Sequence, residues 1–154
     1  IHTADAMITD HPGIALGILT ADCAPIIFFG KKFVGIIHAG WRGLINGIID
    51  KTIELLQKKG EINKNLICSV GPHLKVDSFE IRKDFIFLIK SKNKNYIEFI
   101  KKRGDKTFFD FSECILANLK KRNISNFSIS NYDTHINPSL FYANHHHYFQ
   151  NNIY

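Results

Sequence analysis

Apolar residues in the first part of the chain form short runs that are typical of buried strands. Residues 13–19 are almost entirely Ile, Leu, Ala and Gly, and further apolar runs follow at residues 26–29 and 33–37. A Gly-Lys-Lys sequence at residues 30–32 separates the last two runs and is short enough for a tight turn. The pattern predicts a buried strand at residues 13–19, followed by a hairpin of two strands.

The spacing of apolar residues changes after Gly43. Leucines and isoleucines then recur at helical spacing as far as Leu56, and Lys-Lys-Gly at residues 58–60 is a typical C-terminal end for a helix. Residues 66–70 are again strand-like and end at a Gly-Pro pair. This part of the chain therefore predicts one helix followed by one short strand.

Helical and strand-like patterns alternate in the remainder. Residues 79–89 have helical spacing and precede a lysine- and asparagine-rich stretch that we expect to be a loop. Asp110 is placed to cap a helix that has Glu113 in its first turn and basic residues at its end. Residues 127–129 are strand-like. Strands early in the chain, with helices mixed in later, predict the α/β or α+β class.

Length and composition narrow the class of protein. A chain of 154 residues is long enough for one domain over residues 1–154 with a real core, and we expect its polar-aromatic tail at residues 143–154 to be loosely ordered. No apolar run approaches the ~20 residues that span a bilayer. The N-terminus has neither a signal-peptide pattern nor a Met, so we expect the chain to begin inside a longer gene product.

Cysteine content and charge suggest the compartment and the partners. Three cysteines are an odd number, which argues against a disulfide framework and favours a reducing, cytoplasmic setting. The net charge of +6 would suit acidic partners. However, the lysines are scattered among Asn and Ile, and no nucleic-acid-binding module accompanies them. We therefore expect neither a nucleic acid nor a membrane as partner.

A cysteine and a histidine flank the predicted hairpin at its open end. If its strands pair about residues 30–32, Cys23 lies opposite roughly residue 39, at the same end of the sheet as His38. A thiolate and an imidazole suit zinc or copper, and they also suit a cysteine nucleophile with a histidine base. The structural alternative is a buried cysteine beside a hydrogen-bonded core histidine.

The residues around this pair extend the candidate site. Asp22 adjoins Cys23, and Gly-Trp-Arg-Gly follows at residues 40–43. An arginine at a helix start, beside free N–H groups, suits a phosphate or a carboxylate, and Trp41 offers a flat face for a base. In the structural alternative, Trp41 is core and Arg42 forms an ion pair at the sheet edge.

Several segments of the chain resemble the bacterial laccase-domain family, also called the multicopper polyphenol oxidase or purine nucleoside phosphorylase family. They are ADAMIT, PGIALGILTADCAPIIFF, VGIIHAGWRGLINGIIDKTIELL and VGPHLKVDSFEI. TADC followed by HAGWRG is the most specific signature, and the order and spacing agree over residues 4–81. Beyond residue 81 the match is weaker, although residues 110–123 and 127–129 still resemble the family's later helix and strand.

The resemblance implies an α+β fold with four layers, α/β/β/α, and a metal site in which Cys23 and His38 hold zinc, with copper as the alternative. It also implies phosphorolysis of adenosine, inosine or methylthioadenosine, and deamination of adenosine. Older descriptions of the family are of copper-dependent phenol oxidases. By this analogy, Arg42 holds phosphate or substrate and Asp22 orients the site. The implied partners are purine nucleosides and phosphate, and we expect a monomer or a weak homodimer.

The sequence departs from the family pattern at several places. The family's further metal histidine lies upstream, in a glutamine-x-histidine motif, and neither His2 nor His11 sits in such a motif. The family's GPCI…CCYEV segment appears here without its cysteines, and His73 in that segment either reaches the site or faces solvent. The arginine-rich closing segment is replaced by Asn-His-His-His at residues 144–147. This tract either binds metal adventitiously or, as we expect, has no function.

These observations leave more than one function open. The main prediction is a purine nucleoside phosphorylase with adenosine deaminase activity, in which an open zinc activates water and Arg42 places phosphate. The first alternative is a non-catalytic relative that keeps the fold but has lost its site. The second is a hydrolase in which Cys23 is the nucleophile and His38 the base.

Overall fold

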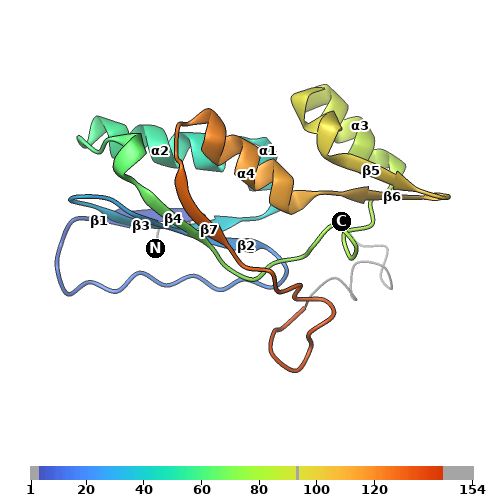
Figure 1. Cartoon of the computed structure of the whole chain (residues 1–154), viewed down its shortest axis with the longest axis horizontal. Coiled ribbons are helices and arrows are strands. Elements are labelled where there is room, and N and C mark those ends of the chain that lie inside the picture. The colour runs from blue at the N-terminus through green and yellow to red at the C-terminus, as the bar shows by residue number, and fades with distance from the viewer. Residues whose placement is uncertain (1–3, 93, 144–154) are drawn as a thin grey trace.

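A five-stranded sheet lies at the centre of the protein, whose computed structural model describes residues 4–92 and 94–143 (Figure 1). The strands lie in the order β1-β3-β2-β4-β7. They span Ala6–Thr9 (β1), Ala24–Phe29 (β2), Val34–Ala39 (β3), Ile67–Val70 (β4) and Asn126–Ile129 (β7). Only β4 and β7 pair in parallel in this sheet, among the residues described. The sheet is therefore mixed, and the predicted α+β class is confirmed.

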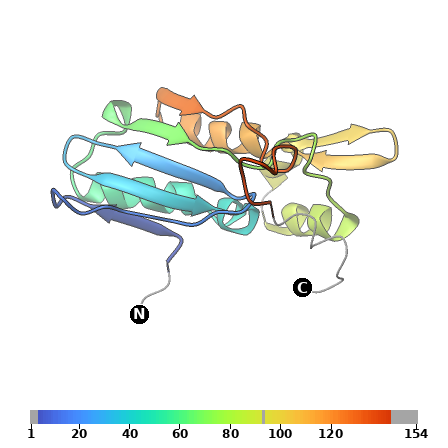
Figure 2. The same ribbon diagram turned by 90° about the horizontal axis from the view of Figure 1, so that it is seen from below.

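Helices cover one face of this sheet, as Figure 1 shows for α1 (Trp41–Ile45), α2 (Ile48–Lys58) and α4 (Phe111–Lys121). The remaining elements are η1 (Asn63–Asn65), α3 (Lys83–Lys92), η2 (Lys94–Phe99), β5 (Ile100–Arg103) and β6 (Lys106–Phe109). The β5–β6 hairpin and α3 lie together at one end of the sheet (Figures 1 and 2). None of the helices in the described part of the chain is long and apolar enough to cross a membrane.

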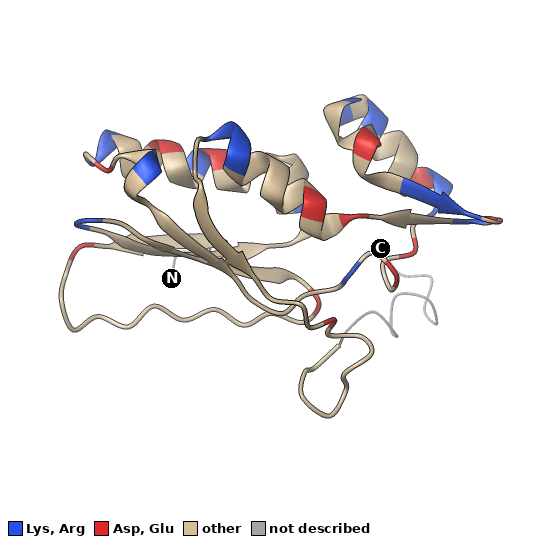
Figure 3. Ribbon diagram, viewed as in Figure 1, with Lys and Arg blue, Asp and Glu red and all other residues tan. Residues whose placement is uncertain are grey.

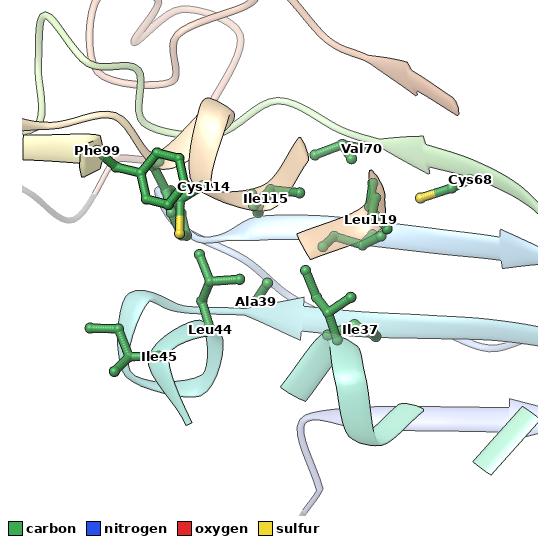
Figure 4. Close-up of a cluster of buried hydrophobic side chains, with 14 of the residues drawn as sticks. Ile37, Ala39, Leu44, Ile45, Cys68, Val70, Phe99, Cys114, Ile115 and Leu119 are labelled. Atoms are coloured by element: carbon green, nitrogen blue, oxygen red, sulfur yellow. The ribbon is translucent and has the colours of Figure 1, made fainter. Parts of the chain in front are cut away.

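The core lies between the sheet and the helical layer (Figure 4). Side chains of β2 alternate, so that Ile26 and Phe28 are fully buried against the helices whereas Ile27 and Phe29 are exposed on the other face. Charged residues gather on the helices and on the β5–β6 hairpin (Figure 3). The described residues therefore supply one helical layer and one sheet of the layered fold that the resemblance implies.

Residues 13–19 do not form the predicted buried strand. They belong to an extended connection between β1 and β2 that passes below the sheet (Figure 1), and they have no strand partner among the described residues. Leu19 is 97% exposed and Ile14 is 53% exposed. Continuous apolar composition predicts burial only where a surface is available to pack against, and in this segment Leu16 and Ile18 are only partly buried.

The helix expected after Gly43 is interrupted. α1 ends at Ile45, and Gly47 takes a left-handed φ of 79° before α2 begins at Ile48. Glycine populates that region without strain, so the chain turns there although the apolar spacing continues across it.

Predictions in the second half are confirmed only in part. The expected cap at Asp110 is present, because its carboxylate accepts a hydrogen bond from the backbone N–H of Glu113 at 3.0 Å. The helix predicted from residue 79 begins only at Lys83, since residues 79–81 are extended and pair with β6. The stretch expected to be a loop contains η2 and leads into β5. Residues 144–154 of the tail lie outside the described residues.

The tight turn between β2 and β3 is confirmed, and Glu61 holds it. The buried carboxylate of Glu61 accepts hydrogen bonds from the backbone N–H groups of Lys31, Lys32 and Phe33 at 2.9, 2.5 and 2.9 Å. Burial raises the pKa of Glu61, but these three donors outweigh it and the pKa is lowered. A Cβ on Gly30 would stand 2.5 Å from the carboxyl carbon, so only glycine allows this close approach.

Candidate functional site

Cys23 and His38 lie at the same end of the sheet. Pro25 pairs with His38 and Ala24 with Ala39, so Cys23 comes opposite Gly40, one residue further than predicted. Its sulfur is 3.3 Å from where a Cβ on Gly40 would be. Because Ala24 and Ala39 are buried on the helix side, alternation places Cys23 and His38 on the opposite face, as diagonal neighbours within reach of one another's side chains.

Asp5 lies beside both of these residues, although sequence reasoning did not single it out. Its backbone carbonyl accepts a hydrogen bond from the N–H of His38 at 2.8 Å. Its carboxylate Oδ1 is 3.3 Å from Nδ1 of His38, and its charge also acts on the thiol of Cys23. The signal that could have found it is the apolar strand after it, which pairs with β3.

The thiol of Cys23 is in a negative, partly buried environment. Burial raises its pKa above the ordinary value, and the charges of Asp22 and Asp5 raise it further. Without a positive partner, this group therefore remains a thiol at neutral pH. A cation such as a metal ion would reverse that preference, because it stabilises the thiolate.

Asp22 is fixed from two distant segments. It adopts a left-handed φ of 72°, which is uncommon for a residue other than glycine. Its carboxylate accepts a hydrogen bond from the Thr134 hydroxyl at 2.7 Å, and its carbonyl accepts one from the N–H of Leu74 at 3.0 Å. Thr134 is buried and follows β7, and no local pattern in the sequence identifies it. These contacts hold the residue before Cys23 in place.

Arg42 and Trp41 follow His38 at the start of α1. The exposed Arg42 guanidinium lies 4.3 Å from the Trp41 ring centroid, in a cation–π contact. The Trp41 ring also contacts Phe85, with 4.6 Å between centroids. Trp41 thus partly covers the core, as the structural alternative holds, and still carries a cation on its ring.

His73 is fully buried, so the alternative in which it faces solvent is wrong. Its Nδ1–H donates to the carbonyl of Gly71 at 2.8 Å, because a carbonyl can only accept. Its Nε2 lies 2.9 Å from the Ser112 hydroxyl and 3.2 Å from the Lys75 ammonium. Burial lowers the pKa of His73 to about 4. Both ring nitrogens are therefore engaged within the protein.

Within the described residues, neither His11 nor His135 completes a three-residue ligand group with this pair. His11 is exposed and its Nδ1 contacts Asp10 at 2.9 Å, whereas His2 and residues 144–147 lie outside the described residues. Within residues 4–92 and 94–143, no group of three or more His, Cys, Asp or Glu side chains could hold a metal ion. Cys23 and His38 are thus a pair of donors whose chemical type fits zinc or copper but which needs further ligands.

Sequence comparisons relate the chain to curated enzymes. It is 35% identical over 136 residues to a purine nucleoside phosphorylase of Aquifex aeolicus, which covers 88% of this chain and 62% of that protein. It is 31% identical over 93 residues to adenosine deaminase RL5 from an unknown prokaryotic organism, which covers 59% of this chain and 36% of that protein. The chain thus spans less than two thirds of the length of these relatives.

Solved structures share the fold. The crystal structure of Neisseria meningitidis protein NMB0706 superposes with a TM-score of 0.80 at 24% identity, covering 92% of this chain and 59% of that chain. The Bacillus licheniformis protein YfiH gives a TM-score of 0.81 at 22% identity, covering 90% of this chain and 55% of that chain. A family model described as multi-copper polyphenol oxidoreductase laccase matches residues 1–149. The chain belongs to this family.

Proposed function

We propose that this chain carries the Cys–His part of the site of a zinc-dependent purine nucleoside phosphorylase that also deaminates adenosine. The observation that supports the proposal is the β2–β3 register, which brings Cys23 and His38 to one end of this strand pair, with Asp5 beside the imidazole. The relatives named purine nucleoside phosphorylase and adenosine deaminase support the choice of substrate class.

The residues have distinct roles in this proposal. Cys23 and His38 hold zinc, with copper as the alternative, and Asp22 fixes the backbone before the cysteine through its contact with Thr134. If zinc were held there, the chemistry it would supply is a bound water with a pKa lowered toward ~7, which suits deamination. Further ligands come from outside this pair, because two donors leave tetrahedral coordination incomplete.

Arg42 is the residue proposed to bind phosphate. A guanidinium binds phosphate oxygens with two parallel hydrogen bonds, and Arg42 is exposed at the turn directly after β3. In the structure it lies over Trp41. A phosphate that draws Arg42 away would free that ring face to stack with a purine base. Phosphate held by Arg42 would then attack the ribose carbon as the base departs.

The two alternatives differ in their support. A non-catalytic relative is favoured by one observation, the lack of a group of three or more metal ligands within the described residues. The hydrolase is disfavoured, because a nucleophilic cysteine needs a lowered pKa and the pKa of Cys23 is raised.

Metal analysis combined with a phosphorolysis assay tests the proposal. We expect the purified chain to contain one zinc per molecule, and to release purine base from adenosine, inosine or methylthioadenosine only when phosphate is present. Cys23→Ala should abolish both the zinc content and the release, whereas Cys68→Ala, which removes a buried thiol on β4, should retain them.

Other outcomes separate the alternatives. A zinc-free chain that releases no base overturns the proposal in favour of the non-catalytic relative. A zinc-free chain whose hydrolytic activity is lost on alkylation of Cys23 overturns it in favour of the hydrolase.

A further inference from the structure

We infer that Asp5 is a positioning residue, whose carboxylate holds His38 with Nδ1 as the N–H donor and Nε2 as the nitrogen that faces the metal. This inference rests on the proposed metal site and deepens it.

The register of β1 on β3 places Asp5 where it can act. Ala6 pairs with Ile37 in this antiparallel ladder, so Asp5 stands directly opposite His38. The hydrogen bond from the N–H of His38 to the carbonyl of Asp5, at 2.8 Å, extends the ladder to that pair. Directly opposed residues project from the same face, with Cβ atoms about 4.5–5.5 Å apart. The pairing of β1 with β3 therefore places the carboxylate of Asp5 beside the imidazole of His38.

The chemistry of the contact selects one tautomer. An ionised carboxylate can only accept a hydrogen bond, and a neutral imidazole has a single N–H. Oδ1 of Asp5 is 3.3 Å from Nδ1 of His38, so the negative carboxylate favours the tautomer with the N–H on Nδ1 and the lone pair on Nε2. Histidines that bind metals usually donate their other N–H to a carboxylate, a carbonyl or water in this way.

The distance fits a contact that tightens on metal binding. At 3.3 Å it is slightly longer than the usual N–H···O range of about 2.7–3.2 Å. A metal on Nε2 would make the Nδ1 proton more acidic, and charge-assisted hydrogen bonds are shorter. The imidazole is 35% exposed, so it has room to make this small adjustment.

A second His–Asp pair provides a matched control. Nδ1 of His11 lies 2.9 Å from Oδ1 of Asp10, in the exposed connection after β1. That contact is shorter than the one between His38 and Asp5, but it joins neighbouring residues at the surface. If Asp5 formed only a surface ion pair, its removal would matter as little as the removal of Asp10.

The first experiment reads the tautomer directly, in the metal-free protein. Nitrogen-15 NMR of the imidazole rings above pH 8 should show His38 protonated on Nδ1 in the wild type and shifted toward the Nε2–H form in Asp5→Ala. His73 is an internal reference, because the carbonyl of Gly71 keeps it protonated on Nδ1 in both proteins. An unchanged His38 tautomer in Asp5→Ala overturns the inference.

The second experiment measures zinc affinity by competition with a chromogenic chelator. Asp5→Ala should weaken zinc binding about 10- to 100-fold. Asp5→Asn should lose less zinc affinity than Asp5→Ala, since its amide oxygen still accepts a hydrogen bond. Asp10→Ala should keep the zinc affinity of the wild type. If the wild type binds zinc and Asp5→Ala binds it equally well, the inference fails while the metal site stands. If the wild type binds no zinc, the proposed function itself fails.

Discussion

Two histidines near the ends of the strands on either side of β2 have opposite environments. His38 ends β3 with a partly exposed ring, and one of its nitrogens contacts Asp5. His73 follows β4, is fully buried and uses both ring nitrogens on groups of the protein. A histidine can serve as a ligand only if it retains a free nitrogen and an approach to it. By that criterion, His38 is available and His73 is not.

The surroundings of His73 explain its structural role. The ammonium of Lys75 donates to Nε2 of His73 at 3.2 Å, to the Ser112 hydroxyl at 3.3 Å and to the carbonyl of Ser130 at 2.5 Å. These groups come from the segment after β4, the first turn of α4 and the end of β7. The cluster therefore joins three parts of the chain. In contrast, the contact between His38 and Asp5 uses only Nδ1 of the imidazole.

The largest expected effect is on metal affinity. His38→Ala removes one of the two proposed ligands and should weaken zinc binding by more than 100-fold, since the loss of groups that only orient ligands costs up to about 100-fold. The thermal midpoint of the metal-free protein should hardly change, because the ring is partly exposed. Chelator competition and thermal melting check both parts. Equal affinity in His38→Ala and His11→Ala would contradict the proposed role of His38.

The next effect is on stability. His73→Ala should lower the free energy of unfolding by about 2–4 kcal/mol, because it opens a cavity and removes the ring nitrogen that Ser112 and Lys75 contact. Urea unfolding of the metal-free protein measures this change. Zinc affinity should remain within error of the wild type. A large loss of zinc affinity with unchanged stability would reverse the assignment of the two histidines.

The pH dependence of stability should also report on His73. Its pKa is about 4 in the folded protein and about 6.5 when unfolded, so between these values the unfolded chain binds a proton that the folded one does not. The free energy of unfolding should therefore fall as the pH decreases from 6.5 to 4. Urea midpoints across this range measure the slope. The slope should be smaller in His73→Gln, and an identical slope would exclude the buried, neutral His73.

The smallest effect concerns Thr134, which supports the cysteine side of the pair. Thr134→Val nearly preserves the shape of the side chain but removes the hydroxyl that donates to Asp22. The free energy of zinc binding should become less favourable by about 1 kcal/mol, which is about fivefold in affinity. Thr134→Ser keeps the hydroxyl and should restore the wild-type affinity. If Val and Ser at this position behave alike, the hydrogen bond to Asp22 has no part in the site.

Local patterns predicted those parts of the fold that depend on neighbours in sequence. The β2–β3 hairpin follows from two apolar runs and a short turn, and the cap at Asp110 follows from residue type alone. Residues 13–19 were mispredicted because their composition does not say whether a surface is there to cover them. The β5–β6 hairpin was missed because its strands carry exposed lysines, as edge strands often do, and so resemble a loop.

In the candidate site, too, contacts between residues close in sequence could be predicted and contacts between distant segments could not. The proximity of Cys23 and His38 could be predicted because both belong to one hairpin. Asp5 could have been found only by pairing the strand after it with β3, and no local pattern in the sequence identifies the contact of Thr134 with Asp22. His73 was mispredicted because its contacts with Lys75 and Ser112 form only when α4 packs beside the sheet, which the sequence around His73 does not show.

The carboxylate of Glu61 has a consequence at the opposite end of the hairpin. The carboxylate of Glu61 accepts three backbone N–H groups of the turn and so fixes its conformation. The conformation of the turn determines which residues of β2 and β3 lie opposite each other. A slip of one position would send every side chain of a strand to the other side of the sheet, the imidazole of His38 included. Cys23 and His38, proposed as ligands of one ion, lie at the far end of the six-residue strand β2, roughly 20 Å along it from this acidic group, so their alignment depends on the turn.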